Sequence, residues 1–217
     1  MCGRFSLFNI DSVAYRFGLE DMPKLRPNYN IAPSQTTAVI LNESPKAVSM
    51  LRWGLIPSWA KDEKMGYKMI NARAESVVEK PSYKGPFRHK RCLVIADGFY
   101  EWKKVGSKKV PFRVTLKQDL FAMAGIWDEW QDIRTFSIIT CAPNKLLKPI
   151  HDRMPVILPK EKETNWLTDG PEDAKKLMKT YPEDGMKAFP ISKLINSPEN
   201  NGPEVIEQIK IEQQMTL

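Results

Sequence analysis

Short apolar runs bounded by turn-forming residues recur along most of this chain, and they predict β-strands. Their members are mainly β-branched and aromatic residues, which fit the pleated and half-buried surface of a sheet. The runs that we expect to form strands are 36–41, 47–53, 92–102, 110–116, 121–127, 135–141 and 154–158. A polar stretch rich in lysine, 103–109, separates two of these runs and predicts a hairpin loop.

Apolar residues at helical spacing occur in only a few segments. We expect a first helix over 11–17, where Gly18 supplies a stop, and later helices over 160–168 and 171–181. Because strands are many and helices are few and segregated, the pattern predicts an α+β fold. We expect one strongly curved or barrel-like, mostly antiparallel β-sheet with peripheral helices.

The length of the chain and the spread of its prolines indicate one domain. A chain of 217 residues can bury a core without staples, and its 17 prolines are scattered instead of gathered into a linker. We therefore expect a single domain over 1–217, with a C-terminal tail from about residue 196. No apolar run approaches the roughly 20 residues of a membrane span, and Arg4 and Asp11 interrupt any signal peptide. These features predict a cytoplasmic protein with no membrane partner.

Cysteine and histidine usage argues against disulfides and against a metal site. The three cysteines, Cys2, Cys92 and Cys141, are odd in number and far apart, so we expect free thiols. The two histidines, His89 and His151, lack the spacing and the neighbouring cysteines of a zinc site. The sequence therefore predicts no metal and no cofactor.

The charge balance of the chain is basic. Lysine and arginine outnumber aspartate and glutamate by 33 to 26, which gives a formal net charge of +7. Such a balance suits a polyanionic partner such as nucleic acid. The excess is modest and also occurs in proteins that bind no polyanion, so charge alone leaves the partner open.

Cys2, directly behind the initiator Met1, has chemistry that no internal cysteine has. If Met1 is removed, the chain begins with a free α-amine next to a thiol, and ordinary pKa values of about 8 and 8.5 leave both reactive near neutrality. The amine attacks an aldehyde to give an imine, and the thiol closes that imine into a thiazolidine. The alternative is a small buried apolar side chain, which is a common place for a free cysteine.

Other ionisable or polar residues interrupt or follow apolar strands, and each has two interpretations. Glu101 lies within a strand pattern, where a buried carboxylate needs a salt bridge or has a catalytic use. His151 is followed by Asp152 and Arg153, so it is either a core histidine or a titratable base with charges nearby. Asn71 follows a strand and a turn, and is either a capping residue or a site residue.

Six motifs, taken in order, resemble one protein family. They are Met-Cys-Gly-Arg-Phe at 1–5, Asn-Tyr-Asn-Ile-Ala-Pro at 28–33, Arg-Trp-Gly-Leu-Ile-Pro-Ser-Trp at 52–59, Asn-Ala-Arg-Ala-Glu at 71–75, Gly-Phe-Tyr-Glu-Trp at 98–102 and His-Asp-Arg-Met-Pro at 151–155. The chain resembles the SRAP family, the SOS response-associated peptidases or abasic-site processing proteins. That family includes a bacterial member and the human 5-hydroxymethylcytosine-binding homologue. The resemblance runs from residue 1 to about residue 195.

The resemblance implies a sensor of abasic sites in single-stranded DNA that crosslinks itself to the lesion and shields it. The implied chemistry is lyase-like and leaves a covalent thiazolidine between the deoxyribose aldehyde and Cys2, after Met1 is removed. By matching motif, Cys2 is the nucleophile and Asn71 positions it. Glu101 handles protons at the amine and the sugar, and His151 is a general acid or base on the deoxyribose oxygen. The family name also implies a peptidase, and autoproteolytic removal of Met1 by Cys2 fits that name. Removal of Met1 by a housekeeping aminopeptidase is the alternative.

Further motif residues are implied to bind the DNA. The expected phosphate contacts are Arg4, Arg73 and Arg153, and the expected stacking surfaces for bases are Trp53, Trp59 and Trp102. From residue type alone, such arginines are more often solvated or paired, and such tryptophans are more often in a core. A basic cluster either extends the DNA track or forms a solvated loop; it consists of Lys84, Arg88, Lys90 and Arg91 around Phe87. The implied partner is single-stranded DNA containing abasic sites, bound by a monomer in the cytoplasm, at the nucleoid.

Two other functions start from the same features. An N-terminal nucleophile amidohydrolase of the glutamine amidotransferase type also begins Met-Cys-Gly, but it needs an Asn-Gly pair for its oxyanion hole. The only Asn-Gly pair in this sequence is Asn201-Gly202, near the C-terminal end. A non-catalytic module that binds DNA or a modified base would keep the basic and aromatic surface and leave Cys2 idle.

Overall fold

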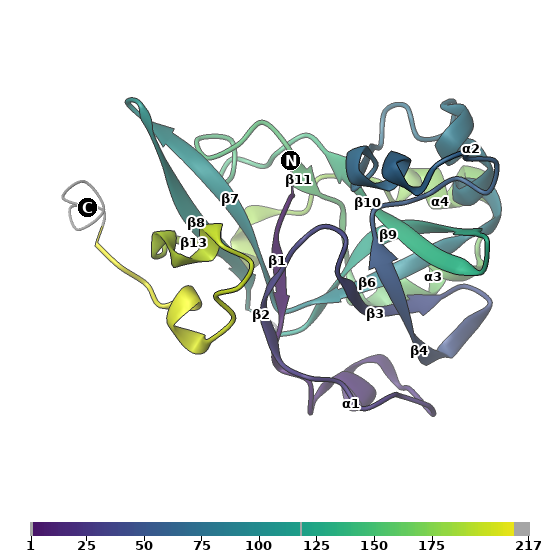
Figure 1. Ribbon diagram of the computed structural model, residues 1–217, viewed down its shortest axis with the longest axis horizontal. Coiled ribbons are helices and arrows are strands. Elements are labelled where there is room, and N and C mark those ends of the chain that lie inside the picture. Colours follow the sequence, from purple (N-terminus) through teal and green to yellow (C-terminus); the bar gives the residue numbers. More distant parts are fainter. Residues whose placement is uncertain (1, 118, 211–217) are drawn as a thin grey trace.

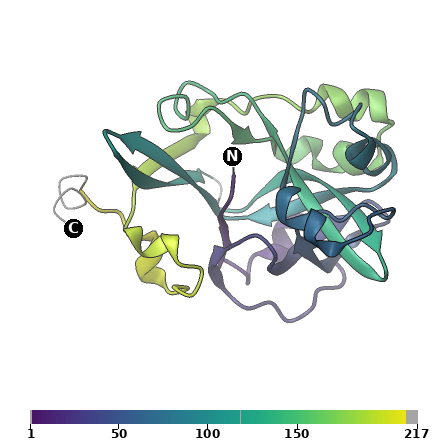
Figure 2. The same cartoon turned by 45° about the horizontal axis from the view of Figure 1, so that its top comes forward.

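The computed structural model of the protein describes residues 2–117 and 119–210, and its strands form two β-sheets (Figures 1 and 2). The strands, in chain order, are β1 (Phe5–Leu7), β2 (Asn28–Ile31), β3 (Thr36–Leu41), β4 (Ser44–Trp53), β5 (Asn71–Arg73), β6 (Arg91–Ala96), β7 (Gly98–Val105), β8 (Lys108–Leu116), β9 (Phe121–Trp130), β10 (Ile133–Cys141), β11 (Met154–Pro155), β12 (Ile157–Leu158) and β13 (Met186–Pro190). The predicted α+β fold is confirmed. Its barrel-like sheet is a closed barrel, and a second sheet lies beside it.

One sheet closes into a barrel of five strands. Strands β10, β4, β3, β6 and β9 are hydrogen-bonded neighbours in that order, and β9 pairs with β10 to complete the ring. All of these pairs are antiparallel except β10 with β4. Strand β5 pairs in parallel with β10, where Asn71 lies beside Ile138. The closed ring of strands has no free edge. Because β5 is hydrogen-bonded to β10 of this ring, the barrel fixes the position of β5.

The second sheet has the strand order β13, β8, β7, β1 and β2. The chain begins in this sheet with β1 and β2, and returns to it from the barrel at Asp97. In both views β1 lies between the barrel and the long β7–β8 hairpin (Figures 1 and 2). The buried Asp97 carboxylate accepts hydrogen bonds from Ser6 Oγ at 2.6 Å and from the N–H groups of Phe8 at 2.5 Å and Asn9 at 3.0 Å. The single strand expected over 92–102 was wrong, because this bonded turn divides the run between the two sheets.

The described helices are short. The α-helices are α1 (Val13–Phe17), α2 (Pro81–His89), α3 (Glu163–Thr168) and α4 (Pro171–Lys176), and the 3₁₀ segments are η1 (Glu63–Lys68), η2 (Lys160–Lys162), η3 (Glu183–Gly185), η4 (Lys193–Asn196) and η5 (Pro203–Ile206). The first predicted helix is confirmed, and Gly18 ends it in the left-handed conformation with φ of 61°. The helix predicted over 171–181 was too long. It ends at Lys176, and the Tyr181 carbonyl accepts a hydrogen bond from Asn144 Nδ2 outside any helix.

Two further predictions from the sequence need correction. A solvated loop was one interpretation of the basic cluster, but Lys84 and Arg88 lie on α2 and Arg91 begins β6. Helix α2 opens with proline and buries Tyr83 and Phe87 at helical spacing. The hairpin loop expected over 103–109 is a tight turn, because cross-strand pairing continues as far as Val105 and Lys108. Gly106, with φ of 60°, makes this turn possible.

A main hydrophobic cluster fills the barrel and the contact between the two sheets. It includes Cys2, Phe5 and Trp53, so the start of the chain is anchored in the core. A smaller cluster around Tyr100 packs the C-terminal 3₁₀ segments against the other face of the second sheet. Among the described residues, no helix combines the length and the apolar character needed to cross a membrane.

Candidate active site

Cys2 is fully buried just before β1, and Asn71 holds its backbone. Asn71 Nδ2 donates a hydrogen bond of 2.8 Å to the carbonyl oxygen of Cys2. Burial raises the pKa of the Cys2 thiol, and the nearby charge of Glu101 raises it further. The thiol is therefore protonated at neutral pH. Met1, whose removal would free the α-amine, lies outside the described residues.

Asn71 has a second polar atom that points to a role at the site. Its side-chain oxygen is buried and has no hydrogen-bond partner among residues 2–117 and 119–210. Tyr83, on α2, donates a hydrogen bond of 3.2 Å to the backbone oxygen of Asn71. Sequence analysis missed Tyr83, which the helical spacing of Tyr83 and Phe87 would have placed on a buried face. The Asn71 side-chain oxygen can therefore accept a hydrogen bond from a group that binds beside the Cys2 backbone.

Strand β7 brings Glu101 to the same place. Its side chain is only 2% exposed, and burial raises its pKa to about 7. A carboxyl group with that pKa exchanges protons near neutral pH, as a general acid or base must. The structure places the imidazole of His151 beside Glu101, so the neighbour described for this carboxyl group is itself a titratable side chain.

His151 faces Glu101 from the loop before β11, with Nε2 lying 3.8 Å from Glu101 Oε2. Its Nδ1 accepts a hydrogen bond of 3.1 Å from the Arg153 N–H and lies 2.9 Å from Asp152 Oδ1. A neutral Nδ1 accepts from the Arg153 amide, whereas a protonated Nδ1 donates to the Asp152 carboxylate. Both protonation states of the imidazole therefore have a partner. Partial burial lowers the pKa of His151, which keeps the neutral form populated.

Arg153 ties the His151 loop to the strands beneath it. Its two terminal nitrogens bind the carboxylate of Glu75 at 2.7 and 2.9 Å, and one of them also donates to the Thr140 carbonyl at 2.5 Å. Glu75 lies two residues after β5, which carries Asn71, so this clamp fixes His151 relative to Asn71. Sequence analysis quoted Glu75 within a motif but assigned it no role. Its position two residues after the strand that carries Asn71 is the feature of the sequence that could have indicated a role for Glu75 at the site.

The geometry thus brings together the four residues expected to carry chemistry. They contribute a thiol, a buried amide acceptor, a carboxyl group with a pKa of about 7 and a neighbouring imidazole. These residues are Cys2, Asn71, Glu101 and His151. Such a set suits a nucleophilic addition that needs protons moved at its centre.

Comparison with known proteins places the chain in a family. A family model described as SOS response associated peptidase (SRAP) matches residues 1–198. The chain belongs to the SRAP family. The six motifs noted in the sequence all lie within the matched residues.

Relatives and solved structures agree with SRAP membership. The chain is 49% identical to abasic site processing protein YoqW of Bacillus subtilis (strain 168), over 95% of this chain and 99% of that protein. It is 32% identical to abasic site processing protein HMCES of Xenopus tropicalis, over 89% of this chain and 69% of that protein. A crystal structure of a protein from Bacteroides thetaiotaomicron superposes with a TM-score of 0.88 at 31% identity, and it covers 96% of this chain and 100% of that one.

Two residues expected to contact DNA in this SRAP chain are engaged inside the protein. The Arg4 guanidinium donates a 2.6 Å hydrogen bond to Asn30 Oδ1. Trp53 is fully buried, with Phe5 at 5.0 Å and Phe136 at 6.4 Å between ring centroids. A base cannot stack on a ring without exposed surface, so this conformation does not support the stacking role expected for Trp53.

Trp102 and most of the basic cluster also have structural partners. Trp102 lies on the face of β7 opposite to that of its neighbour Glu101, because successive strand residues alternate, and its indole N–H donates to Asn196. Within the cluster, Phe87 is buried, and the Arg91 guanidinium binds backbone carbonyls. Lys84 and Arg88, on α2, remain exposed. The cluster is therefore mainly a packing feature with two exposed cations.

Trp59 and Arg73 are the expected DNA residues that the structure leaves exposed. Trp59 is 59% exposed, and Arg73 lies at the surface at the end of β5, two residues after Asn71. Tyr67, which sequence analysis did not single out, is 54% exposed on η1 with the Arg52 guanidinium 5.7 Å from its ring. The segment between β4 and β5 thus presents two aromatic rings to solvent.

The other thiols and the metal-ligating side chains form no second centre in the part of the chain that the structure describes. Cys92 and Cys141 are buried and free. Across 2–117 and 119–210, no group of three or more His, Cys, Asp or Glu side chains lies together as metal ligands would.

Proposed function

We propose that this protein recognises abasic sites in single-stranded DNA and links itself covalently to them through Cys2, which shields the lesion. The observation that supports this most is the place of Cys2, whose backbone is held by Asn71 beside the Glu101–His151 pair. Relatives named abasic site processing proteins suggest the lesion. We propose that the active form is a monomer.

The proposed reaction begins only after Met1 is removed, because an amide nitrogen is a poor nucleophile. The free α-amine of Cys2 adds to the aldehyde of the ring-opened deoxyribose, and loss of water gives an imine. The thiol then adds across the C=N bond. A sulfur–carbon bond forms, the thiol proton goes to the nitrogen, and the product is a thiazolidine.

The burial of the Cys2 thiol supports an order for these steps. Since burial keeps the Cys2 thiol protonated, the amine makes the first attack. Glu101, with a pKa of about 7, takes a proton from the attacking amine and returns one to the departing hydroxyl. His151 is 27% exposed and lies 3.8 Å from Glu101, so it reaches the deoxyribose from the solvent side and protonates its ring oxygen during opening.

The same groups support removal of Met1 by the chain itself, as the family description suggests. In this step Glu101 activates a water molecule that attacks the Met1 carbonyl. The bond between that carbon and the Cys2 nitrogen breaks, and the nitrogen receives a proton. Intact-mass measurement of wild type and Glu101→Gln from the same cells tests this. Retention of Met1 in the variant alone is expected, and equal removal from both would contradict self-processing.

The crosslink is tested with protein whose loss of Met1 is confirmed by mass, mixed with single-stranded oligonucleotide carrying one abasic site. A stable band on a denaturing gel is expected for wild type and for the matched control Cys141→Ala. It should vanish in Cys2→Ala and when the aldehyde is first reduced. Cys2→Ser keeps the amine but loses the thiol, so it should give a band only when borohydride traps the imine. A stable band in Cys2→Ala would refute the mechanism.

The two rival functions receive less support from the geometry. The Asn201 side-chain oxygen, in the only Asn-Gly pair, accepts a hydrogen bond of 2.7 Å from the Tyr29 N–H. This bond fixes Asn201 at the end of β2 that pairs with Leu7, and not at the end of β1 next to Cys2, where an amidohydrolase would need its oxyanion hole. A module that merely binds DNA would have no use for a carboxyl group with its pKa raised to about 7 beside a buried thiol. The oligonucleotide assay separates that module from the proposed function, because only covalent linkage survives denaturation.

A further inference from the structure

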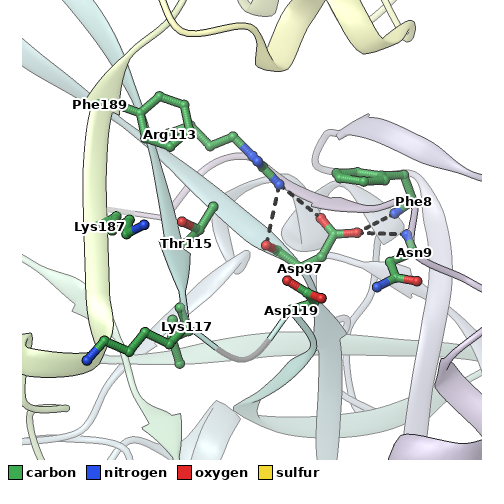
Figure 3. A pocket seen from close by; sticks show the side chains of 10 residues that line it. Phe8, Asn9, Asp97, Arg113, Thr115, Lys117, Asp119, Lys187 and Phe189 are labelled. Carbon is green, nitrogen blue, oxygen red and sulfur yellow. Dashed lines mark hydrogen bonds and ion pairs between the residues drawn. The ribbon is translucent and has the colours of Figure 1, made fainter.

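The second sheet carries a hollow on the face turned away from Cys2. Cross-strand neighbours share a face, and Glu101 is paired with Phe112, whereas Arg113 is paired with Phe189 on β13. Arg113 therefore projects from the opposite face to Glu101. Around it lies a hollow of about 610 Å³ (Figure 3). That volume is in the range of sites that hold small molecules.

One side of this hollow is cationic. Lys117 and Lys187 line it and are exposed, and within residues 2–117 and 119–210 neither forms an ion pair. Figure 3 shows both lysines on one side and Asp97 with Asp119 on the other. An anionic group would therefore lie at the lysine side, where charge-assisted hydrogen bonds favour it and the carboxylates are farthest away.

The upper wall of the hollow includes a guanidinium group and aromatic rings. The Arg113 guanidinium lies 5.3 Å from the centroid of the Phe8 ring, and it is held by Asp97 through contacts of 3.4 Å to the carbonyl and 3.5 Å to the carboxylate. Phe189, from β13, lies on the same wall (Figure 3). Aromatic rings and guanidinium planes are the surfaces on which nucleobases stack.

A second hollow of about 450 Å³ adjoins the first, because Leu116 and Lys117 line both. It contains another cation and another ring, Lys160 and Tyr181. Lys117 thus stands between two hollows that each offer an aromatic surface. This alternation of ring, cation and ring matches the repeat of base, phosphate and base along a nucleic-acid strand.

We propose that the surface formed by these two hollows around Lys117, here called the back surface, is a second binding site, for a nucleotide. Lys117 and Lys187 hold its phosphate, and its base lies against the ring of Phe189. Asp119, on the far side, accepts a hydrogen bond from a base amino group or a sugar hydroxyl. The nucleotide is either free or part of a single strand, since the chemistry of recognition is the same. The site does not depend on the reaction at Cys2.

The test is a titration of ¹⁵N-labelled full-length protein with thymidine 5′-monophosphate, with the dinucleotide pTpT and with thymidine, none of which carries an aldehyde. The amide signals of Thr115, Lys117 and Lys187 are expected to shift when thymidine 5′-monophosphate or pTpT is added. They are not expected to shift with thymidine, which has no phosphate. Rising affinity from one nucleotide to two would assign the site to a strand. Equal affinity would assign it to a free nucleotide.

Substitutions make the assignment specific. The double variant Lys117→Ala/Lys187→Ala should weaken binding of both phosphates about tenfold or more, as expected for the loss of charged hydrogen bonds. The control Lys84→Ala/Lys175→Ala removes the same charge from exposed positions outside both hollows and should bind like wild type. Equal affinity in the two double variants, or no shift of the back-surface amides, would overturn the proposal.

Discussion

Replacing Glu101 with glutamine should change how the stability of this protein depends on pH. The Glu101 side chain is 2% exposed, and burial raises its pKa from the ordinary value of 4.5 to about 7. Between these two pH values the folded protein keeps a proton on Glu101 that the unfolded chain has released. Because the folded state then binds more protons, its free energy of unfolding falls as the pH rises.

The size of this fall follows from the change in pKa. At about 1.4 kcal/mol per pKa unit, ionising the buried carboxyl group lowers the free energy of unfolding by about 3 kcal/mol. Glutamine has nearly the same shape and no proton to lose. Relative to wild type, Glu101→Gln should therefore be almost equal in stability near about pH 4 and about 3 kcal/mol more stable near about pH 8.

Urea denaturation followed by tryptophan fluorescence at a series of pH values measures this difference. Other titrating groups are common to both proteins, so their contributions largely cancel when the two curves are subtracted. Glu79→Gln, at an exposed position, is the matched control and should give a curve parallel to wild type. If the Glu101→Gln curve is also parallel, the reasoning is refuted, and Glu101 is not held in an environment that resists its charge.

Three further outcomes are expected. Gly98→Ala should destabilise the protein by about 2 kcal/mol in urea denaturation, because its Cβ would lie 2.9 Å from Arg113 Nε; unchanged stability would contradict this packing. Asp152→Asn removes a charge that raises the pKa of His151, and His151 must be protonated to act as the proposed acid, so the alkaline limb of the pH profile for crosslinking should move to lower pH; a structural role would instead slow the reaction equally at all pH values. Trp59→Ala should leave stability within about 0.5 kcal/mol but weaken single-strand binding by about 1 to 3 kcal/mol in fluorescence anisotropy; unchanged affinity would exclude base stacking there.

Much of the fold could be predicted from the chain alone because the relevant information is local. The strand predicted over 36–41 coincides with β3, and Gly18 ends the first helix as expected. Each depends on neighbouring residues: an apolar run that fits a sheet, and a residue that tolerates positive φ. The same local view failed at Asp97, where hydrogen bonds to residues about 90 positions away divide one run between two sheets.

The residues of the candidate site could be predicted from the sequence, but their contacts and burial could not. Motif order singled out Cys2, Asn71, Glu101 and His151, and the structure brings them together. Local sequence carried no sign of the unpaired Asn71 oxygen, which arises only because β5, α2 and the start of the chain meet. The raised pKa of Glu101 has the same origin, since burial by distant segments causes it.

By itself, the sequence determined which chemical groups this protein has and the local preferences of its backbone: an N-terminal cysteine, an acid, a histidine, a basic surplus and strands in a recognisable order. Only the tertiary structure decided which of those groups meet solvent. Trp53 and Trp59 stand in one motif, yet the first fills the barrel and the second is 59% exposed. Arg73 is exposed, whereas Arg153 is clamped by Glu75. Exposure and pairing depend on segments far away in the chain, so residue type and spacing could not separate these cases.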